Sequence, residues 1–341
     1  MDWDPGTWLS VGGMVIGLAF GIAAQRSRFC TVAALGNWTL MRDYRQVHAY
    51  LAALSVVVTG TALLQWGDWV AIGESSYRST TLDWVGLSIG GLVFGVGAML
   101  AGGCITRTLI RSAEGNLGSI VALSALILAG MAALFGVIEP LRGNLRAATA
   151  VTLPDGGGAV AQWLGLPNML FAAAIGLICM LLILRTGDWR QGKVLILSGV
   201  LIGMGVVAAW WLTGYAAQDE FEPTQPLSVS VVGPLTRAAV YITLGRTTGS
   251  LFGLFLISGM LAGALLSALA CGDFRWTTPD GARIGHYLAG GAMMGTGAIM
   301  AGGCNIGQGL TGLGTLSVQS AVAVLAMIAG MRLGLWWLAR E

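Results

Sequence analysis

The sequence predicts an all-α polytopic membrane protein that forms a single integral membrane domain over residues 1–341. Three observations lead to this fold class. Only 10% of the residues are charged and 55% are hydrophobic, whereas soluble domains carry about 25% charged residues. The mean hydropathy of +0.76 means that the chain cannot cover a water-facing surface, which excludes a large soluble enzyme. The 53 glycines are roughly twice the usual share, and such glycine in apolar helices indicates close packing or broken helices.

About nine spanning helices follow from the apolar runs, because a run of about 20 apolar residues crosses a bilayer. The nine runs are 8–24, 47–66, 84–114, 118–138, 168–185, 194–213, 250–270, 285–315 and 318–338. Two of them, 84–114 and 285–315, are too long for one span, and a Gly-Gly-Cys sequence interrupts each in the middle. We expect each to form two short helical arms around an irregular break. The moderately apolar stretches 27–41 and 228–246 are candidate half-helices or re-entrant segments.

The basic residues predict the orientation, because cytoplasmic loops carry an excess of Lys and Arg. With the N-terminus outside, 13 of the 18 basic residues fall on the cytoplasmic side and 5 outside, while 10 of the 16 acidic residues fall outside. The 5 outer cations are Arg78, Arg142, Arg146, Arg237 and Arg246. We therefore expect a periplasmic N-terminus and a cytoplasmic C-terminus.

An internal repeat is the most informative feature of the sequence. Residues 90–104 match residues 290–304 at a constant offset of 200, with every glycine and the final cysteine identical. The spans then divide into a first repeat over 1–138, a connecting span at 168–185 and a second repeat over 194–338. Because a single span connects the two repeats, the four spans of the second repeat have the opposite orientation in the membrane. This predicts an inverted-topology repeat (4+1+4), a plan that secondary transporters use with the substrate site near the midplane.

The two Gly-Gly-Cys breaks are the candidate substrate site. Non-helical backbone at membrane depth survives only where protein or a water-lined path surrounds it, so we expect both breaks to meet near the midplane. Gly102, Gly103, Gly302 and Gly303 would allow sharp turns and close approach to a ligand. The helical arm after each break would direct free N–H groups at the same place, which favours an anion.

Cysteines stand at the start of each expected arm. Cys104 and Cys304 occupy matched positions of the repeat, where a thiol is a weak donor and a polarizable contact. Cys30 follows a basic stretch that contains Arg28, and sequence spacing leaves a pathway role and an anchoring role equally open. Cys179 and Cys271 are expected to be small buried hydrophobes.

Polar residues near the breaks have two possible roles. They either satisfy the broken backbone or contact the ligand. These residues are Thr106, Arg107, Thr108, Asn305 and Gln308.

Several function classes are excluded or disfavoured. The net charge of +2 and the absence of a basic stripe speak against nucleic acid. The five cysteines are scattered and the only histidines are His48 and His286, so we expect no metal site and no cofactor.

The motifs resemble those of the YeeE/YedE family of bacterial inner-membrane sulfur-compound permeases. The resemblance rests on Gln-Arg-Ser-Arg-Phe-Cys at 25–30, on Gly-x-Gly to Gly-Gly-Cys at 95–104, and on the matching segment at 295–309. It extends over essentially the whole chain. It implies uptake of thiosulfate from the periplasm along a narrow path lined by Cys30, Cys104 and Cys304, whose S–H groups would relay the anion by hydrogen bonds without covalent change. It also implies a cytosolic TusA-like sulfurtransferase as partner.

The sequence also allows other functions. The substrate could be another sulfur or selenium compound. A membrane enzyme or sulfur-relay protein would use Cys104 and Cys304 as a pair, but a cysteine nucleophile usually needs a base, and neither has a histidine nearby in sequence. A membrane sensor of sulfur anions is the third alternative. We expect a transporter and not an enzyme.

Overall fold

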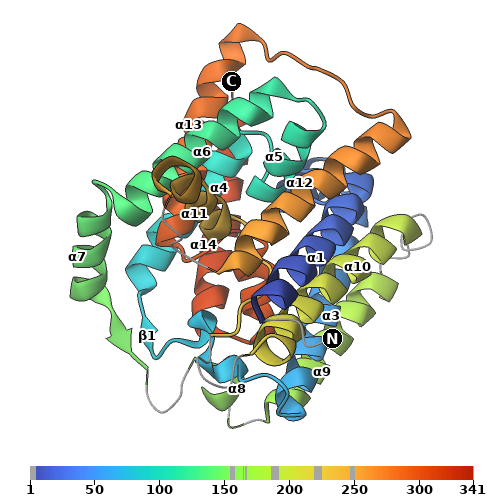
Figure 1. Cartoon of the computed structure of the whole chain (residues 1–341), viewed down its shortest axis with the longest axis vertical. Helices are drawn as coiled ribbons and strands as arrows, with labels where there is room; N and C mark the ends of the chain where they lie inside the picture. The colour runs from blue at the N-terminus through green and yellow to red at the C-terminus, as the bar shows by residue number, and fades with distance from the viewer. Residues whose placement is uncertain are drawn as a thin grey trace.

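A computed structural model describes residues 5–153, 158–163, 165, 167–185, 192–218, 225–245 and 250–340. The described chain is almost entirely helical, and its long helices lie side by side in one bundle (Figure 1). In this view α1 begins in the lower half of the molecule, whereas the C-terminus lies near the upper end (Figure 1). The predicted all-α class is confirmed.

The elements of the first half end with a short strand and a small helix. In order they are α1 (Pro5–Ser27), α2 (Thr31–Met41), α3 (Arg45–Trp66), η1 (Ile72–Glu74), η2 (Ser76–Arg78), β1 (Thr81–Leu82), α4 (Trp84–Leu100), α5 (Ile105–Ala113), α6 (Leu117–Phe135), α7 (Glu139–Thr149), β2 (Val151–Thr152) and α8 (Val160–Trp163). Strands β1 and β2 pair antiparallel, with Thr81 opposite Thr152.

The second half contains the remaining long helices and two π-helical segments. In order they are α9 (Asn168–Arg185), α10 (Lys193–Trp211), η4 (Leu212–Ala216), α11 (Val232–Leu244), α12 (Leu251–Cys271), α13 (Gly281–Met300), η5 (Gly307–Gly312) and α14 (Val318–Leu338). Helices α2 and α11 occupy the two stretches that the sequence assigned to half-helices or re-entrant segments.

The described residues contain eight helical segments long and apolar enough to cross a membrane. The chain is therefore a multi-pass membrane protein. Eight of the nine expected runs correspond to these segments, and the first extends through α2 to Met41. The eighth run, 285–315, is not among them. Its helix α13 is 20 residues long but less apolar, because Arg283 and His286 lie in its first turns and glycine recurs along it.

Helices α4 and α13 approach each other closely through matched glycines. A Cβ atom added at Gly90 would lie 2.7 Å from the Gly297 carbonyl oxygen, and one added at Gly297 would lie 2.7 Å from the Gly90 oxygen. Gly97 and Gly290 have the same relationship, at 2.8 Å in both directions. Any side chain at these positions would push the two backbones apart. The glycine excess of the sequence therefore serves, in part, this crossing.

The same contacts recur between other helices of the two halves. Gly95 of α4 packs on the Met327 carbonyl of α14, while Gly295 of α13 packs on the Leu126 carbonyl of α6; both distances from an added Cβ are 2.3 Å. Likewise, α1 packs on α12 as α10 packs on α3: Gly17 faces the Leu256 carbonyl and Gly203 faces the Ala53 carbonyl. Each of these glycine contacts thus has a counterpart in which the two halves of the chain are exchanged.

Polar contacts join the loops at the end that carries β1. Arg78 is buried and its guanidinium donates to the Thr315 carbonyl at 2.7 and 2.9 Å. Ser317 donates to the Tyr77 carbonyl. These bonds hold the segment after η5 against the loop between α3 and α4.

Candidate functional site

Cys30 and Cys104 are brought together in the core of the bundle. Their Sγ atoms lie 3.9 Å apart, and the two residues are 6% and 3% exposed. Cys30 directly precedes α2, after a turn in which Arg28 takes the left-handed conformation (φ 51°). Cys104 directly precedes α5. Each thiol therefore sits where a helix begins, next to backbone N–H groups that have no partner inside that helix.

The first break closes α4 with a left-handed glycine. Gly102 has φ 71°, and the Gly103 N–H donates back to the Ala98 carbonyl at 3.0 Å. Glycine is favoured here because other residues reach this conformation only with strain. Gly102 is exposed, and the Arg111 guanidinium donates to its carbonyl at 3.5 Å.

The second break begins in the same way. Gly302 has φ 69°, the Gly303 N–H donates to the Ala298 carbonyl at 2.8 Å, and Gly302 is exposed. The arm that follows is different, because it is not the α-helix that the sequence led us to expect. A turn leads into η5, a six-residue π-helix at Gly307–Gly312. Glycine is a poor α-helix former, and three of these six positions are glycine.

Gln308 anchors this irregular arm. Its side-chain Nε2 donates to the Ala301 carbonyl at 3.0 Å, and its Oε1 accepts from the Ser320 hydroxyl at 2.6 Å. Gln308 is 4% exposed. In this structure the amide side chain satisfies broken backbone, which is the first of the two roles that the sequence allowed.

The second break also joins the Cys30 turn. Asn305, next to Cys304, donates from Nδ2 to the Thr31 hydroxyl, next to Cys30. Cys304 is 1% exposed and belongs to the same buried cluster as Cys30 and Cys104. The fold thus gathers all three cysteines of the sequence motifs around one buried region, although they are up to 274 residues apart in the chain.

Thr106 and Arg107, which follow Cys104, differ in their surroundings. Thr106 is 1% exposed and its hydroxyl has no hydrogen-bond partner among the described residues. Arg107 forms an ion pair with Glu114, at 3.2 Å from Nη1 to Oε1. The cation at the first break is instead Arg111, one of the 13 basic residues expected on the cytoplasmic side, for which no role at the break was predicted. It lies one helical turn after Arg107, and this spacing on α5 could have indicated it.

The remaining cysteines lie elsewhere. Cys179 is buried in α9, and Cys271 is half-buried at the end of α12. All five cysteines are free thiols. Within the described ranges, no group of three His, Cys, Asp or Glu residues is placed to hold a metal ion.

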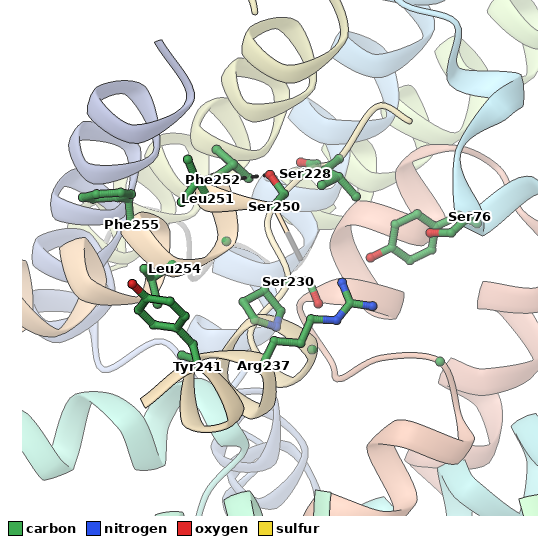
Figure 2. A pocket seen from close by; sticks show the side chains of 17 residues that line it. Ser76, Ser228, Ser230, Arg237, Tyr241, Ser250, Leu251, Phe252, Leu254 and Phe255 are labelled. Carbon is green, nitrogen blue, oxygen red and sulfur yellow. Dashed lines mark hydrogen bonds between the residues drawn. The ribbon is translucent and has the colours of Figure 1, made fainter. Parts of the chain in front are cut away.

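A cavity of about 340 Å³ opens beside the second break. Gly302 lines it together with the loop at Ser76 and Tyr77, the start of α11 and the start of α12 (Figure 2). We call this cavity the outer pocket. Arg237 of α11 points into it (Figure 2). Arg237 is one of the five cations expected on the outer side, and no role was predicted for it.

Tyr77 connects the outer pocket with the Cys304 region. Burial, and then the nearby Cys304 sulfur, raise the pKa of the Tyr77 hydroxyl well above its ordinary value, so this group is a neutral donor. A Cβ atom added at Gly307 would lie 3.2 Å from the Ser230 hydroxyl oxygen and 3.4 Å from that of Tyr77. Both hydroxyls therefore lie against the segment that follows Cys304.

Comparison with known proteins agrees with the geometry. A family model described as "Sulphur transport" matches residues 26–333. The chain is similar to the thiosulfate transporter TsuA of Escherichia coli (strain K12), with 26% identity over 96% of this chain and 94% of that protein. It is 27% identical to the thiosulfate transporter TsuA of Spirochaeta thermophila, over 96% of this chain and 99% of that protein. A probable transporter of E. coli, YedE, is 29% identical over 30% of this chain and 24% of that protein.

Proposed function

This chain belongs to the sulphur transport family, and from that premise we propose that it takes up thiosulfate across the bacterial inner membrane. The two relatives that match over almost their whole length are both named thiosulfate transporters. Thiosulfate would enter from the periplasm and leave at the cytoplasm.

The path for the anion runs past the thiols of Cys30, Cys104 and Cys304. The observation that carries this proposal is the meeting of the two breaks with the Cys30 turn: a sulfur-to-sulfur distance of 3.9 Å on one side and the Asn305–Thr31 hydrogen bond on the other. A thiol donates weakly and its sulfur is polarizable. It therefore suits the terminal sulfur of thiosulfate, which passes from S–H to S–H with no bond formed or broken.

Moving the charge of the anion to membrane depth costs free energy, so groups of the protein must compensate that charge. Donors along the path come from the N-terminal end of α5 and from the open backbone N–H groups around both breaks. The hydroxyl of Thr106, which has no partner among the described residues, is a further donor. Gly102, Gly103, Gly302 and Gly303 let the anion approach the backbone closely. Arg28 and Arg111 make the cytoplasmic mouth positive. Arg107 is instead paired with Glu114.

The architecture that fits this path has nine spans in an inverted repeat. Residues 1–138 form the first repeat, 168–185 the connecting span and 194–338 the second repeat, and α13 with its break completes the ninth crossing. The recurring glycine contacts support this plan, because exchanging the two halves maps the Gly90–Gly297 contact onto Gly290–Gly97. The exposure of Gly102 beside Arg111 and of Gly302 in the outer pocket supports breaks that open toward opposite faces.

The orientation has a periplasmic N-terminus and a cytoplasmic C-terminus. The distribution of Lys and Arg supports it, although Arg190 and Arg246 of that count lie outside the described residues. A TusA-like sulfurtransferase would then receive the sulfur at the cytoplasmic mouth, beside Gly102. The transporter itself performs no catalysis in this scheme.

The test is uptake of ³⁵S-labelled thiosulfate by cells that lack other thiosulfate transporters. Cells expressing the chain should accumulate label, Cys304→Ala should abolish accumulation, and the matched control Cys179→Ala should retain it. Unlabelled sulfate, sulfite and selenite serve as competitors that define the substrate. Uptake that persists in Cys304→Ala at a normal protein level contradicts the thiol path, and no uptake by the unmodified chain contradicts the function.

A further inference from the structure

A second cavity, of about 140 Å³, lies between α2, α3, η5 and α14. We call it the lateral groove. Leu35 and Met331 line it and are buried, whereas Trp38 and Ile328 line it and are exposed. Ile328 lies near the middle of α14, which is one of the helices long and apolar enough to span a membrane. The groove therefore opens on a surface of the bundle that faces lipid.

Arg332 lies at the rim of the lateral groove. It follows Met331 on α14 and is exposed, and its guanidinium carbon lies over the Trp38 ring, 5.7 Å from the ring centroid. Six residues separate it from Leu338, the last residue of α14, which corresponds to about 9 Å of helix. An arginine side chain can extend from this depth to the level of the lipid headgroups.

The charge of Arg332 has no acidic partner among the described residues. The ion pairs found there involve other arginines. The Trp38 ring attracts the guanidinium but carries no net charge that could neutralise it. Because a cation on the lipid-facing surface of a spanning helix is costly unless an anion pairs with it, the rim of the groove favours a negatively charged ligand.

An anionic phospholipid matches both parts of this site. Its phosphate can accept two parallel hydrogen bonds from a guanidinium, and one of its acyl chains can fill the apolar groove. Arg42, directly after α2 and four residues beyond Trp38, is exposed and adds positive charge, while the neighbouring Asp43 is already paired with Arg45. Such basic sites between spanning helices recognise anionic headgroups.

The inner end of the lateral groove reaches the proposed substrate path. Thr31 and Asn305 line it, and these two residues form the hydrogen bond that joins the Cys30 turn to the second break. Tyr50 also lines it, and its ring stacks on that of Phe29 with the centroids 6.2 Å apart. An acyl chain in the groove would pack against this junction.

We propose that the lateral groove binds one acyl chain of an anionic phospholipid, whose phosphate is held by Arg332. The bound chain fills the space between α2 and α14 and stabilises the Thr31–Asn305 junction. Lipid binding does not depend on the proposed function. Its effect on transport rests on that function, so the two are tested by separate measurements.

The binding test titrates the purified full chain in detergent with dioleoyl phosphatidylglycerol, and native mass spectrometry gives the Kd of the first lipid bound. Dioleoyl phosphatidylethanolamine, which has the same chains and no net charge, is the comparison lipid. The variants are Arg332→Gln, Arg332→Lys and Arg340→Gln. Arg340 is the matched control, because its guanidinium also lies over a tryptophan ring, that of Trp336, but it is not at the groove.

We expect one molecule of phosphatidylglycerol to bind more tightly than those that follow, and more tightly than phosphatidylethanolamine. Arg332→Gln should raise the Kd of this first molecule by about fivefold, since one arginine near a membrane surface contributes about that much to anionic lipid binding. Arg332→Lys should retain most of the affinity, and Arg340→Gln all of it. Equal Kd values for the two lipids, or for Arg332→Gln and the unmodified chain, would overturn the inference. A dimer that binds no lipid would overturn it too.

A second pair of variants tests the acyl chain. Ala34→Leu places a larger side chain in the groove, because Ala34 lines it and is buried. Ala329→Leu adds the same atoms on an exposed part of α14 outside the groove. We expect Ala34→Leu to weaken phosphatidylglycerol binding while Arg332 is still present, and Ala329→Leu to leave it unchanged. Unchanged binding in Ala34→Leu would contradict a chain inside the groove.

The effect on transport is measured in vesicles. The purified chain is reconstituted in phosphatidylcholine with and without phosphatidylglycerol, and initial rates of ³⁵S-thiosulfate uptake are compared. A negative vesicle surface by itself repels the anion, yet we expect phosphatidylglycerol to raise the rate of the unmodified chain and not that of Arg332→Gln. Equal responses of the two proteins would overturn the effect on transport. No uptake in either kind of vesicle would instead contradict the proposed function, and the binding result would stand.

Discussion

The Sγ atoms of Cys30 and Cys104 lie 3.9 Å apart in the buried centre of the bundle. A disulfide bond is about 2.05 Å long, so the two sulfurs would have to approach by about 2 Å to form one. Cys30 follows α1 and Cys104 follows α4, so this contact fixes the position of the first break relative to the N-terminal helices.

The sulfur contact predicts selective trapping by a thiol oxidant. Treatment with diamide should join Cys30 and Cys104: the two thiols give up two protons and two electrons, and diamide is reduced to its hydrazine form. Because the disulfide removes both S–H donors from the path, ³⁵S-thiosulfate uptake should fall and return after dithiothreitol. Mass spectrometry of proteolytic peptides checks the pairing, with Cys104→Ala as the control that cannot form it. A bond from Cys30 to Cys179 instead would contradict the geometry.

Serine and alanine substitutions at Cys104 should have different effects. A hydroxyl still donates a hydrogen bond, whereas a methyl group cannot, so Cys104→Ser should retain a small part of uptake and Cys104→Ala none. The control Cys271→Ala should leave uptake normal, because this thiol lies at the end of α12. Equal activity in the serine and alanine variants would speak against hydrogen-bond relay at this position.

Gly297→Val should destabilise the protein through the α4–α13 crossing. A Cβ at this position would lie 2.5 Å from the Phe94 backbone nitrogen, and overpacking of this kind typically costs about 1–3 kcal/mol. Thermal unfolding of the detergent-solubilised protein, followed by size-exclusion chromatography, measures the loss. Gly285→Val on the same helix is the control, since nothing lies within 4 Å of an added Cβ there. Equal melting temperatures for both variants would contradict the close crossing.

Arg107→Gln should affect stability more than transport. The ion pair with Glu114 is partly exposed, at 14% and 17% of the two side chains, and such pairs contribute up to about 1 kcal/mol. We expect a small loss of thermal stability and a KM for thiosulfate close to normal. A double-mutant cycle with Glu114→Gln measures the coupling. A large rise in KM in Arg107→Gln, with none in Glu114→Gln, would indicate that Arg107 contacts the substrate.

Labelling of single introduced cysteines tests the orientation. Ala148 on α7 and Ala282 on α13 are both exposed and are expected on opposite sides of the membrane. In whole cells a membrane-impermeant maleimide should label Ala148→Cys, and Ala282→Cys should be labelled only after the membrane is permeabilised. The reverse pattern would place the N-terminus inside.

The amino-acid sequence by itself determined the fold class, most of the spans and the positions of both breaks. Each of these depends on local information: apolar runs of membrane length, glycines that permit left-handed backbone, and a segment that recurs 200 residues later. The repeat also indicates Cys104 and Cys304 as a pair, because they occupy matched positions. The weaker apolarity of α13 is equally local, and it explains why the eighth run is not among the segments apolar enough to cross a membrane.

Only the tertiary structure decided what these residues contact. The approach of Cys30 to Cys104, the bond from Asn305 to Thr31 and the outer pocket around Arg237 all join segments that are far apart in the chain, and one sequence carries no direct signal for such pairs. The pairing of Arg107 with Glu114 and the π-helix after Cys304 were missed for a related reason. Which partner a long side chain takes, and how a glycine-rich arm winds, depend on competing neighbours that are present only once the helices have packed.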